Sequence, residues 1–570
     1  MGPGKGLASP RAATQDFVEV PMGVAEMAVH AETILRNGTV WCGRAEGVVQ
    51  AVALWGGRVL ATGADAEIAP LIGPDTRVID LNGRLAMPGL IDAHLHLLPY
   101  GLGMLEVDAR PQNAPTLEDL LGLIKARADA LGPGKWVLAR GYNEFKLDVR
   151  RPPWRKELDR VAPDNPVHLV RTCGHISICN SKAFELAGIT ATTVAPPGGL
   201  IEVQNGQLTG MLAENGRDAI RKVLPAASDE DLVGGIERAG QYLNSLGITS
   251  CMDAAVGMHS HFREIGAYFS AERSGRLPVR TYMCLLGDPG PKSIVPDCHR
   301  AGLVTGAGHD MLRVGPVKIF TDGSAGGRTA WMSQPYRGEH ATVGVSCQTD
   351  AVLDEYVLDY HRKGYQMAIH AIGDAAIEQV LSSYEKALAA APDADRRHRI
   401  EHCGFLTDDH IARMKAAGVY PAPQPVFIYD FGDLYYSVLG SGRPEASYPM
   451  RGWFNADLKP SASTDAPVCD ASPFPNIYTM LTRKTGKGTV IGGQQTLGID
   501  ETLQAYTEYG AFAEKAETRK GRLAPGLLGD VAVFSRDMTK AAPEEILQDT
   551  RCDLTIRGGT VVFDRHGETR

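Results

Sequence analysis

The chain has 570 residues and a mass of 61.2 kDa, which is too long for one ordinary domain of about 100–200 residues. Hydrophobic residues make up 44% and charged residues 22% of the chain, a globular composition that excludes a disordered or fibrous protein. The net charge of -9 gives no sign of a basic surface, so we expect no nucleic-acid partner.

The ten cysteines are scattered along the chain, and no two of them form a C-x-x-C pair. In a chain of this length the pattern indicates reduced thiols rather than a disulfide framework. The N-terminus lacks the apolar core of a secretory signal, and no apolar run reaches the roughly 18 residues that a membrane span needs. We therefore expect a cytoplasmic protein with no membrane partner.

The two ends of the chain carry the same kind of pattern. Residues 1–24 are rich in Gly, Pro and Ala and predict a flexible leader. Residues 25–86 then show short β-rich runs separated by Asn-Gly and Gly-Gly turns, and residues 523–570 show similar runs. We predict one small β-sandwich-like domain that is assembled from both ends.

The middle of the chain, residues 87–522, alternates strand-like apolar runs with helical patterns. This alternation predicts an α/β fold, a TIM-like (β/α)8 barrel. A doubly wound sheet is the alternative, but no G-x-G-x-x-G opens a helix after a first strand. The stretch of about 104–230 interrupts the alternation after the first barrel strand, and we predict an insertion that forms a lid over the active-site face.

The strongest local motif is an H-x-H sequence after the apolar run MPGLI. His94 and His96 are two residues apart, so in a strand their side chains point to the same face. Two imidazoles directed at one point suit a metal such as Zn²⁺. The alternative is a pair of buried histidines that are bonded to backbone groups.

Four more chemically capable residues stand at the ends of predicted strands. Lys318, His370, His402 and Asp465 each follow β-branched or apolar residues. A parallel barrel brings the carboxyl ends of its strands together around one mouth. We therefore expect these four side chains to lie near His94 and His96.

These motifs resemble the amidohydrolase superfamily, and more narrowly the subgroup that includes N-substituted formamide deformylases. The resemblance extends from about residue 27 to the end of the chain. It is carried by MPGLIDAHLH, NSKAFELAGI, PPGGLI, VKIFTDGSAGGRTAWM, IHAIGDAAI, RIEHC, STDAPV and GRLAPGLLGDVAVF.

The resemblance implies a binuclear metal site. His94 and His96 would hold one divalent ion together with Asp465, and His370 and His402 would hold a second. Lys318, carboxylated on Nζ, would bridge the two, since a plain ammonium has only donors and a positive charge. Zn²⁺ is the first expectation for both ions, and one ion is expected if Lys318 is not carboxylated. The subgroup also contains dimers, so a homodimer is one expectation.

The chemistry that follows is hydrolysis of a non-peptide amide C–N bond by a metal-activated hydroxide, with Asp465 as general base and acid. The substrate would be a small-molecule amide, with an N-substituted formamide as the first expectation and a cyclic amide as an alternative. A mononuclear deaminase is a further alternative. It needs a carboxylic acid near the strand-end histidine, and Glu401, next to His402, should point to the opposite face of a regular strand. A non-catalytic regulator on the same fold is the last alternative.

Weaker candidates lie in the insertion. His175 could donate a hydrogen bond to the substrate oxyanion, or it could be a structural histidine. Asn143 and Glu144 follow a Gly-Tyr pair at a position where the subgroup often has a polar residue, which suggests a substrate contact.

Three further substrate candidates lie on predicted barrel loops. Asp322 follows Lys318 by four residues and could orient metal ligands, contact the substrate or cap a turn. Phe427 and Arg451 lie in the predicted loop after the seventh strand, which should face the mouth. Phe427 and its aromatic neighbours could line an apolar substrate pocket, or they could pack against a lid or a second subunit.

Overall fold

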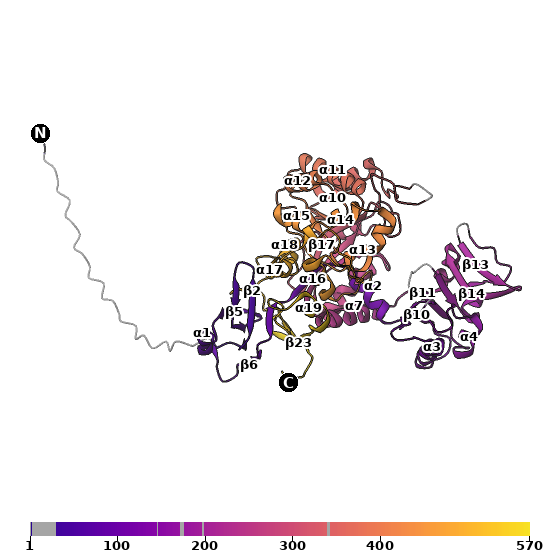
Figure 1. Cartoon of the computed structure of the whole chain (residues 1–570), viewed down its shortest axis with the longest axis horizontal. Coiled ribbons are helices and arrows are strands. Elements are labelled where there is room, and N and C mark those ends of the chain that lie inside the picture. Colours follow the sequence, from indigo (N-terminus) through magenta and orange to yellow (C-terminus); the bar gives the residue numbers. More distant parts are fainter. Residues whose placement is uncertain are drawn as a thin grey trace.

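The structure is a computed structural model, and Figure 1 shows its course. It describes residue 2 and residues 30–569, apart from residues 145, 172–175, 197–198 and 339–341. The predicted leader, residues 1–24, falls almost entirely outside the described residues. No helix in the described part of the chain is long and apolar enough to cross a membrane.

The centre of the molecule is a seven-stranded parallel sheet that curves into a nearly closed barrel, as the alternation of strands and helices predicted. The strands are buried along their length, which explains their continuous runs of Val, Ile, Ala and Met. In spatial order they are β20 (Tyr420–Ala422), β19 (Arg399–His402), β18 (Met367–Ala371), β17 (Leu312–Phe320), β16 (Arg280–Leu286), β15 (Ile248–Val256) and β8 (Leu90–Leu95).

The segment 461–466 occupies the eighth position of the barrel without forming a named strand. It hydrogen-bonds to β8 through Ala93 N to Ala462 O at 3.3 Å and Asp465 N to His94 O at 2.8 Å. On the other side, Ser463 Oγ donates to Pro423 O, just beyond β20, at 2.8 Å. This segment therefore bridges the two edges of the sheet and brings Asp465 beside β8.

Helices surround the barrel and follow its strands. Several begin with a side-chain cap: Ser228 caps α7, Thr349 caps α10 and Thr407 caps α12. The helices are α2 (Leu97–Met104), α7 (Asp229–Asn244), α8 (Arg263–Arg273), α9 (Val295–Arg300), α10 (Asp350–Arg362), α11 (Asp374–Ala390), α12 (Asp408–Ala417), α13 (Val426–Leu439), α14 (Arg443–Ala446), α15 (Met450–Asn455), α16 (Pro473–Thr482), α17 (Ile499–Ala505), α18 (Glu508–Ala513) and α19 (Pro543–Asp549).

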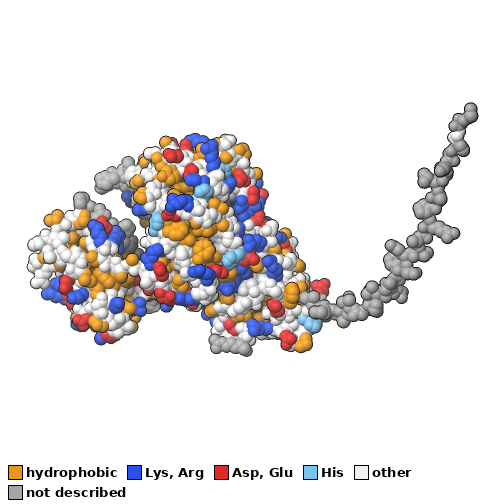
Figure 2. Space-filling view, turned by 180° about the vertical axis from the view of Figure 1, so that it is seen from behind, with side chains coloured by type: hydrophobic (Ala, Val, Ile, Leu, Met, Phe, Trp, Pro, Cys, Tyr) orange, Lys and Arg blue, Asp and Glu red, His pale blue; other side chains and the backbone are white. Residues whose placement is uncertain are grey.

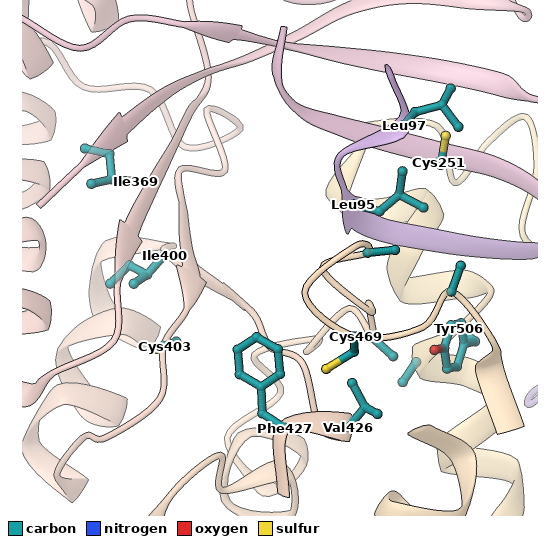
Figure 3. Packing of buried hydrophobic residues seen from close by; sticks show 14 of the residues in the cluster. Leu95, Leu97, Cys251, Ile369, Ile400, Cys403, Val426, Phe427, Cys469 and Tyr506 are labelled. Atoms are coloured by element: carbon teal, nitrogen blue, oxygen red, sulfur yellow. The ribbon is translucent and has the colours of Figure 1, made fainter. Parts of the chain in front are cut away.

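One expectation about these helices is wrong. The aromatic stretch after the seventh strand, expected to be a loop, forms the 14-residue helix α13. Its apolar residues recur at helical spacing, and Phe427 packs 5.4 Å from Phe431 between ring centroids. Figure 3 shows Phe427 and Val426 of this helix beside Cys469 in the buried core.

Two sheets next to the barrel are built from the terminal regions (Figure 1). One has the order β5-β4-β1-β6 and uses only N-terminal strands: β1 (Thr33–Arg36), β4 (Ala51–Trp55), β5 (Arg58–Gly63) and β6 (Arg77–Asp80), with helix α1 (Asp65–Ile68) alongside. The other has the order β23-β22-β21-β7-β2-β3 and mixes both ends: β2 (Thr39–Gly43), β3 (Gly47–Val49), β7 (Leu85–Pro88), β21 (Val531–Phe534), β22 (Cys552–Arg557) and β23 (Thr560–Asp564).

The described residues between 107 and 223 form a separate body that is attached through α2 and α7. Its six-stranded sheet has the order β13-β14-β12-β11-β10-β9, and it has hydrophobic clusters of its own. Figure 1 shows this body beside the barrel, and Figure 2 shows it from behind as a distinct lobe. Its elements are β9 (Val107–Asp108), α3 (Leu117–Leu131), β10 (Val137–Tyr142), α4 (Arg155–Val161), β11 (Val167–Arg171), β12 (Ile176–Cys179), α5 (Ser181–Ala187), β13 (Gly199–Gln204), β14 (Gln207–Glu214) and α6 (Asp218–Val223).

Candidate metal centre and active site

Three candidate ligands from three separate strand ends converge at the mouth of the barrel. Ligand atoms of His94, His402 and Asp465 all lie within 4.8 Å of one another, and all three residues are buried. His94 comes from β8, His402 ends β19, and Asp465 lies near the end of the segment in the eighth position. The group thus combines residues that the family resemblance divided between two ions.

The Asp465 carboxylate faces both histidines of the H-x-H motif. Its Oδ1 atom lies 3.4 Å from His94 Nε2 and 3.3 Å from His96 Nε2. This oxygen is buried and has no hydrogen-bond partner among the described residues. A buried carboxylate oxygen without a partner is costly, and this one is aimed at two nitrogen ligands.

The partners of the imidazoles show which nitrogen carries the proton. His94 Nδ1 contacts Glu401 Oε2, which can only accept while Glu401 is ionised, so Nδ1 donates and Nε2 offers its lone pair. His402 Nδ1 lies 2.6 Å from Gln424 Oε1. The Gln424 amide nitrogen donates to Ser463 Oγ, which fixes Oε1 as an acceptor for His402.

Lone pairs on His94 Nε2 and on Asp465 Oδ1 therefore face each other, and a cation bound between them would relieve their repulsion. Burial lowers the pKa of His94 and holds the pKa of His402 well below the ordinary value, so a protonated imidazole is disfavoured. A divalent cation fits this donor set, since imidazole nitrogen and carboxylate oxygen are the usual protein ligands of Zn²⁺ and similar ions.

Asp465 is set up to stay ionised. Burial disfavours its charged form, but His94 and His96 hold its pKa well below the usual range when their rings carry a proton toward Oδ1, and a divalent cation in that place would favour the carboxylate in the same way. Its backbone is in the left-handed region with φ 58°, and His402 has φ 65°. These turns at the ends of extended segments direct both side chains into the mouth.

Lys318 lies inside the same cluster. It is fully buried, and its Nζ atom is 3.5 Å from His94 Nε2 and 4.8 Å from the centroid of the Phe320 ring. Burial lowers the pKa of the Lys318 amine, and Glu401 opposes that shift. A neutral amine is the form that reacts with carbon dioxide to give a carbamate.

His370 lies next to the cluster but is turned toward a different partner. Its ring centroid is 4.4 Å from that of His402, while its Nε2 lies 3.1 Å from Asp322 Oδ1 and 3.2 Å from Gly323 O. Asp322 also accepts hydrogen bonds from the backbone N–H groups of Ile372 at 3.0 Å and Gly373 at 2.8 Å. Asp322 therefore orients His370 and the turn that follows it.

The expectation that Glu401 points away from the site is wrong. Glu401 is fully buried, contacts His94 and pairs with Arg399 Nε at 2.8 Å. Burial disfavours its carboxylate, but Arg399 and His94 outweigh burial and lower its pKa to about 2. Glu401 shares one face of β19 with Arg399, two residues earlier, and this face is the one that meets His94. The positive φ of His402 turns the end of the strand, so the His402 side chain reaches the site region as well.

Sequence reasoning missed two other supporting residues. Gln424 orients His402, and Asp92 accepts from Thr464 Oγ1 at 2.6 Å and from the His94 backbone N–H at 3.2 Å. Burial raises the pKa of Asp92 to about 7, although Thr464 and the backbone bonds oppose the shift. The only sequence signal was position: Asp92 alternates with His94 and His96 in the predicted strand, of which β8 contains Asp92 and His94, and Gln424 follows the seventh strand.

The three weaker candidates predicted in the insertion are His175, Asn143 and Glu144. His175 lies outside the described residues. Glu144 pairs with Arg171 at 2.8 Å within the insertion, and Asn143 accepts a backbone hydrogen bond from Lys146 at 3.0 Å. Their relation to a substrate stays a prediction.

Phe427 and Arg451 differ in their relation to the cluster. The Phe427 ring is nearly parallel to the His402 ring, with centroids 6.1 Å apart, and it is buried. Arg451 lies on α15 and donates to Glu501 Oε2 at 2.6 Å and to Thr496 O at 3.2 Å. Phe427 thus borders the candidate metal centre, whereas the Arg451 guanidinium is used in a contact with α17.

The comparisons with known proteins agree with the geometry. The profile of the Amidohydrolase family matches residues 77–563. The chain is 28% identical over 523 residues to the YtcJ protein of Bacillus subtilis (strain 168), which covers 90% of this chain and 96% of that protein. It is also 28% identical over 531 residues to the N-substituted formamide deformylase of Arthrobacter pascens, covering 91% of this chain and 95% of that enzyme.

A solved structure shows the same fold. The crystal structure of an uncharacterized metal-dependent hydrolase from Pyrococcus furiosus superposes with a TM-score of 0.73 at 27% identity, covering 89% of this chain and all of that chain. Together with the buried His94, His402 and Asp465 group, this match supports a divalent metal in the barrel mouth. The chain therefore belongs to the amidohydrolase family and is a hydrolase that acts on C–N bonds other than peptide bonds.

Proposed function

We propose that this enzyme hydrolyses the C–N bond of a small non-peptide amide, with an N-substituted formamide as the first candidate substrate. The observation that carries the proposal is the position of Asp465, whose Oδ1 faces the Nε2 atoms of His94 and His96 from 3.3–3.4 Å. The similarity to the N-substituted formamide deformylase over most of both chains supports the choice of substrate.

The residues present fit one or two divalent ions, with Zn²⁺ first. The first ion would be held at the mouth of the barrel by four residues: His94, His96, His402 and Asp465. His370, and Lys318 as a carbamate, would complete a second position; without the carbamate we propose one ion. A bound divalent cation supplies an acidified water and polarises the substrate carbonyl.

Asp465 is the proposed general base and acid. Its ionised carboxylate accepts the proton of the attacking water and then delivers that proton to the departing nitrogen, so the amine leaves in neutral form. The buried surroundings exclude bulk water, which strengthens these charge interactions. Phe427 closes one side of the site and would contact an apolar part of the substrate, and we retain His175 as a proposed donor to the oxyanion.

A panel of amides with metal analysis tests the proposal. The enzyme is loaded with Zn²⁺, its metal content is measured, and formanilides, N-alkyl formamides, acetanilides and hydantoins are assayed for amine or acid release. Turnover of formamides ahead of acetanilides supports the proposal, and turnover of hydantoins alone would point to a cyclic-amide hydrolase. No turnover by fully metallated enzyme across the panel would exclude an amide hydrolase of this kind.

A mononuclear deaminase is the second candidate, favoured by one observation. His370 Nε2 is directed to Asp322 and Gly323, and the single three-residue ligand group within the described residues omits His370. Against it, Glu401 is engaged by Arg399 and His94 and offers no free acid. Two ions per chain together with amide turnover would exclude this candidate.

A further inference from the structure

A buried ion pair lies in the barrel interior directly beneath the candidate metal centre. Glu401 and Arg399 are two residues apart on β19 and are both almost fully buried. Arg399 Nε lies 2.8 Å from Glu401 Oε1, and Arg399 Nη2 donates to Glu401 Oε2 at 3.0 Å. The Nη2 hydrogen bond and the Nε ion-pair contact together keep the carboxylate beside the guanidinium.

The same pair is connected to β8 on both sides of His94. Glu401 Oε2 accepts from His94 Nδ1, and Arg399 Nη2 donates to the carbonyl of Ala93 at 2.8 Å. The pair therefore sets both the ring of His94 and the backbone just before it. A buried ion pair is weak evidence for stability, since apolar residues of the same size often serve as well. The contacts of the Arg399–Glu401 pair with His94 and Ala93 indicate instead that the pair positions the candidate metal ligand His94.

His402 is a second buried candidate ligand whose ring nitrogen has an identified partner, so it can be compared with His94. His402 Nδ1 is held by Gln424 Oε1, a neutral amide, whereas His94 Nδ1 is held by a carboxylate. Hydrogen bonding to a carboxylate makes an imidazole a more basic metal ligand, because it draws the Nδ1 proton away from the ring. The carboxylate partner should therefore make His94 a more basic ligand than His402, whose partner is a neutral amide.

We infer that Glu401 is a positioning residue that fixes the proton of His94 on Nδ1 and makes His94 Nε2 the dominant ligand of the metal, with Arg399 keeping the carboxylate in place. This inference rests on the proposed divalent cation at His94, His402 and Asp465, and it does not depend on the identity of the substrate. Arg399 also compensates the charge of Glu401, so the net charge beneath the centre stays near zero.

The test is the affinity of the protein for Zn²⁺, measured without substrate by competition with a chromophoric chelator. The main variant is R399M/E401Q, which removes both charges together and leaves an amide beside His94. We expect its dissociation constant for Zn²⁺ to rise about 10–100-fold, and activity to return when Zn²⁺ is supplied in excess. A matched control, R280M/D530N, removes a buried ion pair at the start of β8, where Asp530 O accepts from Gly89 N, rather than beside His94 near its end. This control should leave the Zn²⁺ dissociation constant within about twofold.

The variant Q424A separates the effect of charge from the loss of a hydrogen bond, and it should weaken Zn²⁺ binding less than R399M/E401Q does. If R399M/E401Q fails to fold, E401D draws the carboxylate back from His94 and should raise the dissociation constant by several-fold. The d–d absorption bands of the Co²⁺-loaded variant should also shift. An unchanged Zn²⁺ dissociation constant in the folded variant, or a larger effect of Q424A, would overturn the inference; failure of the amide panel alone would not.

Discussion

The guanidinium of Arg280 pairs with both carboxylate oxygens of Asp530, from Nε to Oδ2 at 2.7 Å and from Nη2 to Oδ1 at 2.8 Å. Arg280 begins β16 of the barrel, and Asp530 immediately precedes β21 of the mixed terminal sheet. Asp530 also accepts from the Gly558 N–H at 2.7 Å. This buried pair joins the barrel to the sheet that both ends of the chain build.

We expect D530A to destabilise the protein by about 3–5 kcal/mol, because it leaves the Arg280 charge buried without its partner. The measurement is the thermal or denaturant midpoint of the full chain. D129A serves as the control, since Asp129 pairs with Lys125 on an exposed helix surface and should cost less than about 1 kcal/mol. Equal effects of the two substitutions would contradict this account of the interface.

The variant D465N should lower kcat by about 10²–10⁴-fold, because the amide cannot accept and return the proton in the reaction. The measurement is steady-state kinetics with the metal content determined in parallel, so that loss of metal is not mistaken for loss of the base. A D465N enzyme that holds its metal and keeps wild-type kcat would remove Asp465 from the proposed chemistry.

The pH dependence of kcat/KM should rise from acid toward neutrality. The pKa of Asp465 lies well below the usual range, so Asp465 is already ionised at the start of that rise. The rise should instead report the water acidified by a divalent cation, whose pKa is about 7 in well-studied zinc enzymes. We would measure the profile at constant free Zn²⁺, and a flat profile between pH 5 and 7, roughly the window of that titration, would be inconsistent with it.

Removal of the metal should lower thermal stability as well as abolish activity. A cation that binds only the folded chain stabilises it by about 2.7 kcal/mol at a concentration 100-fold above its dissociation constant. Dialysis against a chelator should therefore lower the Tm, and Zn²⁺ should restore it. H94A should show the low Tm without any response to Zn²⁺; if H94A responds as the wild type does, the cation binds elsewhere.

His168 on β11 should make the insertion sensitive to acid. It is buried with Nε2 2.9 Å from Ser177 Oγ, and burial together with Arg217 and Arg221 lowers its pKa from 6.5 to about 4. Between pH 6.5 and about pH 4, His168 is protonated in the unfolded chain but not in the folded chain. Its contribution to the free energy of unfolding is therefore complete above pH 6.5 and decreases as the pH falls to about 4. The total loss is about 3 kcal/mol.

Amide hydrogen exchange of β11, corrected for the intrinsic effect of pH, would measure that loss. H168Q keeps a polar side chain opposite Ser177 but cannot be protonated, so protection of β11 should then change little between pH 7 and the folded-state value of about 4. The same acid-dependent loss of protection in H168Q would assign it to another group.

The insertion should move as one body when substrate binds. Its hydrophobic clusters contain only its own residues, and Figure 1 shows it attached beside the barrel through α2 and α7. We propose that it closes over the mouth as a lid, so a non-hydrolysable amide should reduce the radius of gyration measured by X-ray scattering. The test requires saturating ligand, and an unchanged radius would argue for a fixed insertion.

The periodicity of the chain was enough to predict the barrel and the convergence of its strand ends. Short apolar runs alternating with helical patterns have few stable arrangements, and a parallel barrel is one of them. The H-x-H motif and the isolated Lys318, His402 and Asp465 could be recognised because each stands where a strand must end. Recognition of the family followed from the same residues, and the match over residues 77–563 confirms it.

Tertiary structure decided how these residues are oriented. No pattern in the sequence indicates that His402 adopts a positive φ, that Glu401 contacts His94, or that Gln424 holds His402. These contacts join residues separated by as many as 307 positions, and they depend on backbone turns that local propensity does not encode. The types of ligand are a property of the amino-acid sequence, whereas the proton on each imidazole, and hence its lone pair, is set by neighbours that only the folded chain brings into contact.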